Sequence, residues 1–471
     1  MNEPSAPRIE ETEVVVVGAR CAGSATALTL AAAGRSVIAL DSASFPSDTL
    51  STHLLWPAGV FELRELGVLD RVEATGAPRL TTAMAVGAGH TLSAPFTPLH
   101  GIDYGLCVRR VHLDAALVDA AVAAGVRVRQ KCRVLELAQE GGRCRGVRYR
   151  DTDGAVREIR ASLVIGADGR RSTVARLVGA QEPYLEQPSG RDCYFAYWRD
   201  VDPDRRHIAV QWREGADLGT AFPCDDGLVL SLVQPPAVAG PLRPGDADRR
   251  YHDAIARLPE LVERLDGCAR VGGVRSATGI RSYFRHSSGP GWALAGDAGH
   301  FKDPVTAQGI RDAMYYGRVL GKRVAPVLDN PVALDAVTRG WEELRLRECL
   351  EVYQWTNRLA RGEAMRPWEI EMYHRAVTDP VLAAAVIEIF SRTRNPGALF
   401  TPWESVSLST LALWRSKAAP GAVVRDIVRE LRDTADEWLE TRRALHPPTR
   451  GARPVPGAAL PDPVTESAAT A

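Results

Sequence analysis

Lysine is scarce in this sequence of 471 residues, and the chain has no excess of positive charge. Lysine occurs only at positions 131, 302, 322 and 417, and arginine supplies most of the 58 basic side chains. The 58 acidic side chains balance them, so the formal net charge is zero. A balanced chain has no general electrostatic attraction for polyanions. We therefore expect neither nucleic acid nor an acidic membrane as its main partner.

Long apolar runs and paired cysteines are also missing. No apolar run approaches the roughly 18 residues of a membrane span, and residues 1–13 are polar, so we expect neither a span nor a signal peptide. The eight cysteines are scattered without a Cys-x-x-Cys pair, which is typical of reduced thiols and a cytoplasmic protein. His-Glu-x-x-His and Gly-x-Ser-x-Gly are absent too, so we expect neither a metal nor a serine nucleophile.

The first informative segment is a strand–helix–strand unit from Glu13 to Asp41. Residues 14–17 form a β-branched strand, 22–33 a helix of small residues and 36–40 a second strand. Gly18 and Gly23 occupy the first and third positions of a dinucleotide fingerprint, and an acid at the end of the second strand binds ribose hydroxyls. Arg20 replaces the middle glycine, so its side chain either points away or contacts a phosphate. The candidate nucleotide-binding residues here are Gly18, Arg20, Cys21, Ala22, Gly23, Asp41 and Ser42.

Two later segments each place an acid after a buried strand. In LVIGADGRRSTVAR, from residue 163, Asp168 and Gly169 form a turn that suits nucleotide phosphates, although an ordinary turn fits equally well. In GWALAGDAGHFKDPVTAQG, from residue 291, Gly296 and Asp297 follow a strand at the edge where ligands of open α/β sheets bind. A helix is predicted over 310–319, with its free N–H groups facing outward. Taken alone, this segment is better explained as an ordinary strand–turn–helix with a capping Asp.

Together the three segments resemble the class A flavoprotein monooxygenases of the para-hydroxybenzoate hydroxylase type. That family has a dinucleotide motif, then Asp-Gly, then Gly-Asp followed by Pro and Gly-Gln-Gly, and an Arg-x-x-Leu-Asp element matched here by residues 110–114. The resemblance implies an FAD site in which Asp297 binds the ribityl chain. Departures from the family pattern are Arg20, Ala307 and Arg311. The further FAD-binding residues that the resemblance implies are Thr52, Arg110, Asp168, Gly169, Gly296, Asp297, Pro304, Gln308, Gly309 and Ile310.

The expected fold is α/β, a Rossmann-like FAD-binding domain with an inserted antiparallel β-sheet substrate domain and a C-terminal helical region. Four parts are expected: the discontinuous FAD-binding domain (1–78, 103–180 and 276–331), the substrate domain (79–102 and 181–275), the helical region (332–445) and a disordered tail (446–471). Within the helical region, periodicity predicts helices over 334–361, 380–391, 408–416 and 422–445.

Candidates for substrate contact and proton transfer come from the predicted sheet and from the link 50–57. Tyr197, Gln211 and Trp212 lie on predicted strands as substrate candidates, but neighbours on a strand face opposite sides, and for any single one packing is the better explanation. His53 is a candidate general base. A loop histidine that is merely solvated or hydrogen-bonded is the alternative. His300 is expected to be a structural contact.

The resemblance implies a monooxygenase that uses NADPH or NADH, FAD and O₂, and hydroxylates or epoxidises an aromatic or polycyclic small molecule of secondary metabolism through a flavin C4a-hydroperoxide. A geranylgeranyl-reductase-like enzyme and a flavin-binding redox sensor remain alternatives. A flavin halogenase is disfavoured, because Trp-x-Trp-x-Ile-Pro is absent and the lysines are expected to lie away from the site. A monomer or homodimer is expected.

Overall fold

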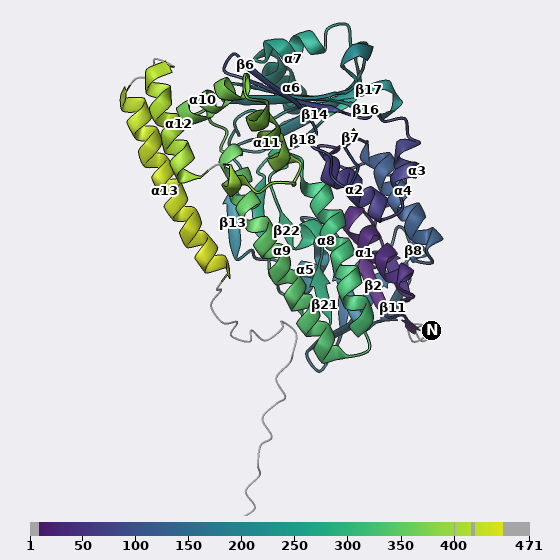
Figure 1. Ribbon diagram of the computed structural model, residues 1–471. Coiled ribbons are helices and arrows are strands. Elements are labelled where there is room, and N and C mark those ends of the chain that lie inside the picture. The colour runs from purple at the N-terminus through teal and green to yellow at the C-terminus, as the bar shows by residue number, and fades with distance from the viewer. Residues whose placement is uncertain (1–8, 400, 416–419, 446–471) are drawn as a thin grey trace, which may run out of the picture.

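The computed structural model describes residues 9–399, 401–415 and 420–445, and shows a mixed α/β protein with a helical C-terminal part (Figure 1). The tail predicted over 446–471 lies outside the described residues. Among the residues that are described, no helix is both long and apolar enough to cross a membrane.

A six-stranded sheet forms the centre of the first domain. All neighbouring strands pair in parallel except β20, which is antiparallel to β21. In order across the sheet the strands are β20 (Ser288–Gly289), β21 (Trp292–Leu294), β12 (Leu163–Gly166), β2 (Val14–Val17), β3 (Val37–Leu40) and β8 (Arg127–Arg129). The four valines of β2 are buried, because both faces of the sheet are covered.

One face of this sheet carries α1 (Cys21–Ala32), α4 (Arg110–Ala123) and α8 (Gly309–Val324). Two glycines of α8 let it approach α1 closely: a Cβ on Gly317 would lie 2.7 Å from the Ala22 carbonyl oxygen, and one on Gly321 would lie 2.8 Å from Thr29 Cβ. The helix predicted over 310–319 is longer than expected: it begins at Gly309 and continues to Val324. The same domain contains α2 (Pro57–Glu65), α3 (Leu69–Glu73), β4 (Leu54–Leu55) and β7 (Leu106–Cys107).

The other face is covered by a four-stranded sheet and by α5 (Thr173–Leu177), through a shared apolar cluster. Its strands, in order, are β1 (Ile9–Glu11), β11 (Val156–Arg160), β10 (Arg143–Arg150) and β9 (Arg133–Glu140).

A seven-stranded sheet lies across the top of the molecule in Figure 1. Its pairings are antiparallel except for one parallel pair, β15 with β5. Helices α6 (Asp246–Ala256) and α7 (Pro259–Arg264) pack on one face. The strands, in order, are β18 (Ala269–Ala277), β14 (Cys193–Arg199), β17 (Leu228–Val233), β16 (Asp217–Cys224), β15 (Ile208–Glu214), β5 (Thr82–Gly87) and β6 (His90–Pro95). A separate three-stranded sheet consists, in order, of β13 (Leu185–Pro188), β19 (Arg281–Phe284) and β22 (His300–Phe301).

The C-terminal helices each begin at a proline, the residue best suited to the first helical position. Helix α10 was not predicted, and the first turns of three others extend beyond the predicted starts, because a proline at a helix start resembles a loop signal in sequence. The helices are α9 (Pro331–Leu359), α10 (Pro367–Ala376), α11 (Pro380–Phe390), α12 (Pro402–Arg415) and α13 (Pro420–Leu445).

Candidate functional site: a nucleotide cavity at the sheet edge

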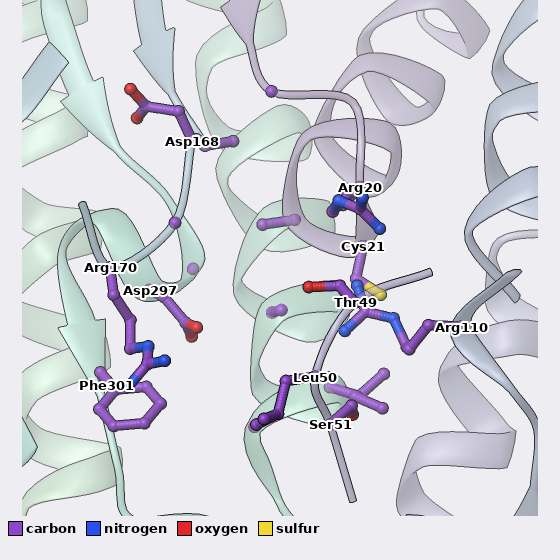
Figure 2. Close-up of a pocket in the computed structure, with 18 of the residues that line it drawn as sticks. Arg20, Cys21, Thr49, Leu50, Ser51, Arg110, Asp168, Arg170, Asp297 and Phe301 are labelled. Carbon is purple, nitrogen blue, oxygen red and sulfur yellow. The ribbon is translucent and has the colours of Figure 1, made fainter. Parts of the chain in front are cut away.

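A cavity of about 500 Å³ lies at the carboxyl edge of the parallel sheet, between α1, α4 and the start of α8 (Figure 2). Segments far apart in sequence meet there, including residues 49–52, 167–170 and 296–313. The sequence candidates that line it are Gly18, Arg20, Cys21, Ala22, Asp41, Ser42, Thr52, Arg110, Asp168, Gly169, Gly296, Asp297, Pro304, Gly309 and Ile310. Gly23, His53, Tyr197, Gln211, Trp212 and Gln308 lie outside the lining.

The turn from β2 into α1 forms a backbone cradle that leaves no space for a side chain at Gly18 or at Gly23. Gly18 has φ +97°, and a Cβ there would lie 2.4 Å from the Ala167 carbonyl oxygen. A Cβ on Gly23 would lie 1.8 Å from the Gly18 oxygen. Asp41 fixes the turn by accepting hydrogen bonds from the amides of Ala19 (2.7 Å) and Ala43 (2.8 Å). This cradle, with the N-terminus of α1 beside it, fits the pyrophosphate of a dinucleotide.

Arg20 and Arg110 converge on one buried carboxylate beside this cradle. Arg20 contacts Asp114 and also donates to Ser47 Oγ at 2.8 Å. Arg110 donates to both oxygens of Asp114, at 2.9 and 3.0 Å. Two guanidinium groups against one carboxylate leave a positive surplus at the cavity wall, which suits phosphate. The Arg20 side chain therefore lines the cavity rather than pointing away from it.

Asp168 caps a helix. Its carboxylate accepts from Ser172 Oγ at 2.6 Å and from the amides of Thr173 (2.6 Å) and Val174 (3.2 Å), at the start of α5. Burial raises the pKa of this carboxyl, while these hydrogen bonds oppose the shift. The side chain thus meets orphan N–H groups of a helix, as a capping acid does.

Asp297 faces the cavity beside Arg170, at a turn that Gly296 makes with φ +57° (Figure 2). Burial raises the pKa of its carboxyl to about 6, and the charges of Arg170 and Arg110 oppose the shift. Within the described part of the chain, no hydrogen-bond donor reaches this carboxylate, whereas its carbonyl oxygen accepts from Tyr283 Oη at 2.6 Å. Asp297 is therefore free to accept hydrogen bonds from the hydroxyl groups of a ligand.

The start of α8 forms another wall of the cavity. Ala307 precedes it in the left-handed conformation (φ 53°, ψ 37°), which explains why a glycine is usual here. The Gln308 amide group donates to the carbonyl oxygens of Ile389 and Phe390, at 3.0 and 3.1 Å, and so anchors the end of α11. Arg311 stacks on the Tyr315 ring, 4.1 Å from its centroid. The first amides of α8 remain available to a ligand.

Comparison with known proteins identifies this cavity. Residues 11–336 match the protein family described as the FAD binding domain. The chain belongs to that family of flavoproteins. It is an FAD-dependent oxidoreductase, which confirms the predicted resemblance, fold class and cofactor.

Several known proteins align with most of this chain. A menaquinone reductase of Mycolicibacterium smegmatis is 27% identical over 74% of this chain and 83% of its own length. Squalene epoxidase 3 of Arabidopsis thaliana is 26% identical over 68% of this chain and 61% of its own length. The structure of the flavin-dependent brominase Bmp2 superposes with a TM-score of 0.69 and 20% identity, covering 87% of this chain and all of that chain.

His53 lies outside the flavin cavity, in a left-handed conformation with φ 60°. Its Nε2 is 2.8 Å from Tyr197 Oη, and the side chain is fully buried. Burial and the nearby charge of Arg110 lower its pKa to about 3. An imidazole that resists protonation so strongly is a poor general base at neutral pH. This placement favours the packing interpretation for His53.

The substrate candidates on the sheet separate onto its two faces. Trp212 donates its indole N–H to Glu260 of α7 at 2.8 Å and packs with α6 and α7. It therefore points away from the flavin cavity, and this argues against substrate contact by Trp212. Gln211 and Tyr197 belong to the opposite face, where Ala209 and Phe195 pack towards α10 and α11.

Sequence reasoning missed several cavity residues. Arg170, Phe301, Ala277 and Ile280 line it, and so does Lys302. The expectation that the lysines lie away from the site is therefore wrong for Lys302. A lysine inside a buried strand–turn–helix motif was the available signal, but its contacts depend on α8 and α11, which only tertiary packing places beside it.

Proposed function

We propose that this flavoprotein is an NAD(P)H-dependent monooxygenase that hydroxylates or epoxidises an aromatic or polycyclic small molecule. The observation that carries the proposal is an apolar wall of the cavity, where Leu50, Ala277, Ile280 and Phe301 belong to one apolar cluster with Ala307, which lies just before α8. Such walls exclude water and pack against flat apolar molecules. Squalene epoxidase 3, a relative in sequence, is named for an oxygen insertion of this kind.

The chain's own residues would hold FAD and leave its chemistry to the cofactor. The β2–α1 cradle with Arg20 and Arg110 would hold the phosphates, and Asp297 would accept from ribityl hydroxyls. When bound, FAD accepts a hydride from NAD(P)H and activates oxygen. The free amides at the start of α8 and its dipole would stabilise negative charge on the ring. His53 would keep Tyr197 in place through their hydrogen bond.

A second candidate is an oxygen-independent reductase of isoprenoid double bonds. The similarity to menaquinone reductase supports it, since the coverage of both chains is high. The same apolar wall would accept a prenyl chain. A flavin-binding redox sensor is the non-enzymatic alternative, because FAD binding does not require turnover.

One set of measurements separates these functions. The purified protein is assayed for bound flavin, then for NAD(P)H oxidation and oxygen uptake with phenols, indoles, aromatic polyketides, menaquinones and prenyl lipids. Substrate-dependent oxygen uptake with a hydroxylated or epoxidised product supports the proposal. Anaerobic reduction of a prenyl chain supports the reductase instead, and flavin binding without turnover of any substrate supports the sensor.

A further inference from the structure

Lys302 occupies a buried position between the flavin cavity and the core behind it. Only 2% of its side chain is exposed, yet it lines both the main cavity and a small one of about 10 Å³ behind the start of α8. Its ammonium group lies 2.7 Å from Asp312 Oδ2 and donates to Gln308 Oε1 at 2.9 Å. Gln308 is the residue before α8 and Asp312 lies in its first turn, so Lys302 is fixed against the helix end that faces the cavity.

The charges around Lys302 do not balance. Asp312, with 7% of its side chain exposed, is the common partner of Lys302, Arg311 (3.1 Å) and Arg392 (3.6 Å). Glu348 also lies near Arg392, but its side chain is exposed to solvent. Around Asp312 itself, three largely buried cations face one carboxylate, which leaves a positive surplus, and the positive end of the α8 dipole adds to it.

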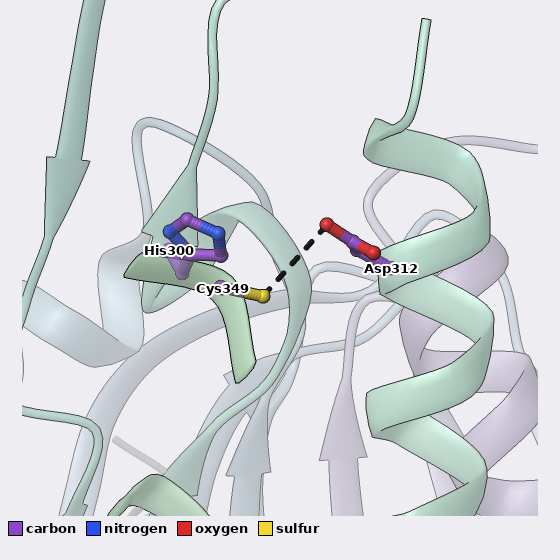
Figure 3. A group of neighbouring side chains, drawn as sticks. All are labelled: His300, Asp312 and Cys349. Carbon is purple, nitrogen blue, oxygen red and sulfur yellow. Dashed lines mark hydrogen bonds between the residues drawn. The ribbon is translucent and has the colours of Figure 1, made fainter. Parts of the chain in front are cut away.

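A surplus charge in a buried place is costly unless an opposite charge approaches it. The same cluster also contains His300 and Cys349, which lie near Asp312 (Figure 3). These three could hold a metal by spacing alone, but Asp312 is already paired with cations, and Cys349 Sγ lies 3.3 Å from Tyr316 Oη. A metal cation would add to the positive surplus. The cluster is instead suited to a negative charge on the cavity side.

We propose that Lys302, held by Asp312 and Gln308, stabilises the negative charge that FAD gains on reduction and so raises its reduction potential. Hydride transfer from NAD(P)H gives NAD(P)⁺ and the anionic reduced flavin FADH⁻, so one negative charge appears on the ring. Lys302 lines the cavity together with Gly309 and Ile310 at the start of α8, so Lys302 and this helix end would meet the charge together. The inference needs FAD binding only, and it holds for a monooxygenase and a reductase alike.

The test compares FAD-loaded Lys302→Met with wild type and with Lys302→Arg, which keeps the charge. Lys322→Met is the matched control, because Lys322 is exposed near the far end of the same helix. Two properties are measured: the midpoint potential of bound FAD, and the affinity of oxidised FAD for sulfite, an anion whose adduct also places negative charge on the ring. Neither measurement involves substrate turnover.

We expect Lys302→Met to weaken sulfite binding at least tenfold. The same variant should bind reduced FAD less tightly relative to oxidised FAD, and each tenfold loss in this ratio of affinities lowers the two-electron potential by about 30 mV. Lys302→Arg and Lys322→Met should stay within threefold of wild type. An unchanged potential and sulfite affinity in Lys302→Met would overturn the proposal. If Lys302→Met does not retain FAD, Asp312→Asn tests the proposal instead. Loss of the negative charge that faces Lys302 should raise the reduction potential of FAD and tighten sulfite binding. A lower or unchanged potential and sulfite affinity in Asp312→Asn would contradict the proposal.

Discussion

At the scale of single residues, two glycines decide whether a nucleotide can approach the sheet edge. Gly18 needs its positive φ, and Gly23 needs to lack a side chain because the backbone of Gly18 occupies the space. A backbone oxygen cannot move aside as a flexible side chain can. The fingerprint positions are therefore steric requirements of the turn, and the Arg20 side chain escapes the same requirement by extending along the cavity wall to Asp114.

We expect Gly23→Ala to lose most FAD binding and to destabilise the fold by about 1–3 kcal/mol through overpacking, since the new Cβ would lie 1.8 Å from the Gly18 oxygen. Flavin-to-protein absorbance ratios and urea unfolding measure both effects. Gly340→Ala in α9 is the control: its Cβ meets no atom within 4 Å, so it should keep FAD and gain up to about 1 kcal/mol of helix propensity. Normal FAD content in Gly23→Ala would contradict the steric argument.

We expect Asp297 to make the folding stability of the flavin-free protein depend on pH. Its folded-state pKa, raised to about 6 by burial, exceeds the ordinary value of 3.8, so the folded protein keeps a proton that the unfolded chain releases. The flavin-free protein therefore loses stability as the pH rises through this interval, and Asp297→Asn does not. We expect the variant to be more stable than wild type by roughly 1–2 kcal/mol at pH 7.5 and similar at pH 4. Urea unfolding at both pH values measures this; a constant difference between them would exclude Asp297 as the cause.

At the scale of elements, the connections that follow strands of the parallel sheet build most of the cavity. The turns after β2, β12 and β21 lead towards α1, α5 and α8, and each brings backbone N–H groups to the carboxyl edge of the sheet. The acids that follow β3, β12 and β21 have different partners. Asp41, after β3, fixes the turn between β2 and α1, Asp168 caps α5, and Asp297 faces the cavity.

Asp168→Ala tests whether this acid is a cap or a phosphate contact. Because it satisfies the first amides of α5, we expect its loss to cost about 1–2 kcal/mol of unfolding free energy. FAD affinity should change less than threefold. Ser172→Ala, which removes the neighbouring cap bond to the Ala175 amide, should show the same pattern. Fluorescence titration with FAD and chemical unfolding give the two values, and a large loss of affinity with unchanged stability would favour the phosphate contact.

At the scale of the whole molecule, ion pairs attach the C-terminal helices. Arg366 beside α10 pairs with Asp426 and Glu430 of α13, and Arg358 of α9 pairs with Glu430 and Glu437. Asp426 and Glu430 are buried, with 5% and 3% of their side chains exposed. Replacing one of the arginines by an uncharged residue would leave these carboxylates buried without an opposite charge, which costs far more stability than losing an exposed pair.

We expect Arg366→Met to destabilise the attachment of α13 by about 3 kcal/mol, with faster hydrogen exchange over 420–445 and unchanged FAD content. The control is Arg347→Met, which removes an exposed pair with Glu343 within α9 and should change stability by less than about 0.5 kcal/mol. Hydrogen exchange followed by mass spectrometry locates the effect. Equal exchange over 420–445 in both variants would show that these pairs do not hold α13.

The sequence by itself determined the strand–turn–helix units of the flavin domain. Valines 14–17, the glycines at 18 and 23 and the strand before Asp297 carry local signals, since β-branched residues favour buried strands and a tight turn needs glycine. The acids at the ends of these strands could also be identified from the sequence, but the groups that each of them contacts could not.

Only the tertiary structure decided what lies against those units. Arg20 meets a carboxylate 94 residues away, Trp212 faces α7, and Lys302 is buried between Asp312 and the cavity. Strand alternation offers two faces but does not say which is covered by which helix, and the charge balance around Lys302 comes from α8 and the segment after α11. Such contacts arise from packing between distant segments, which local propensity does not specify.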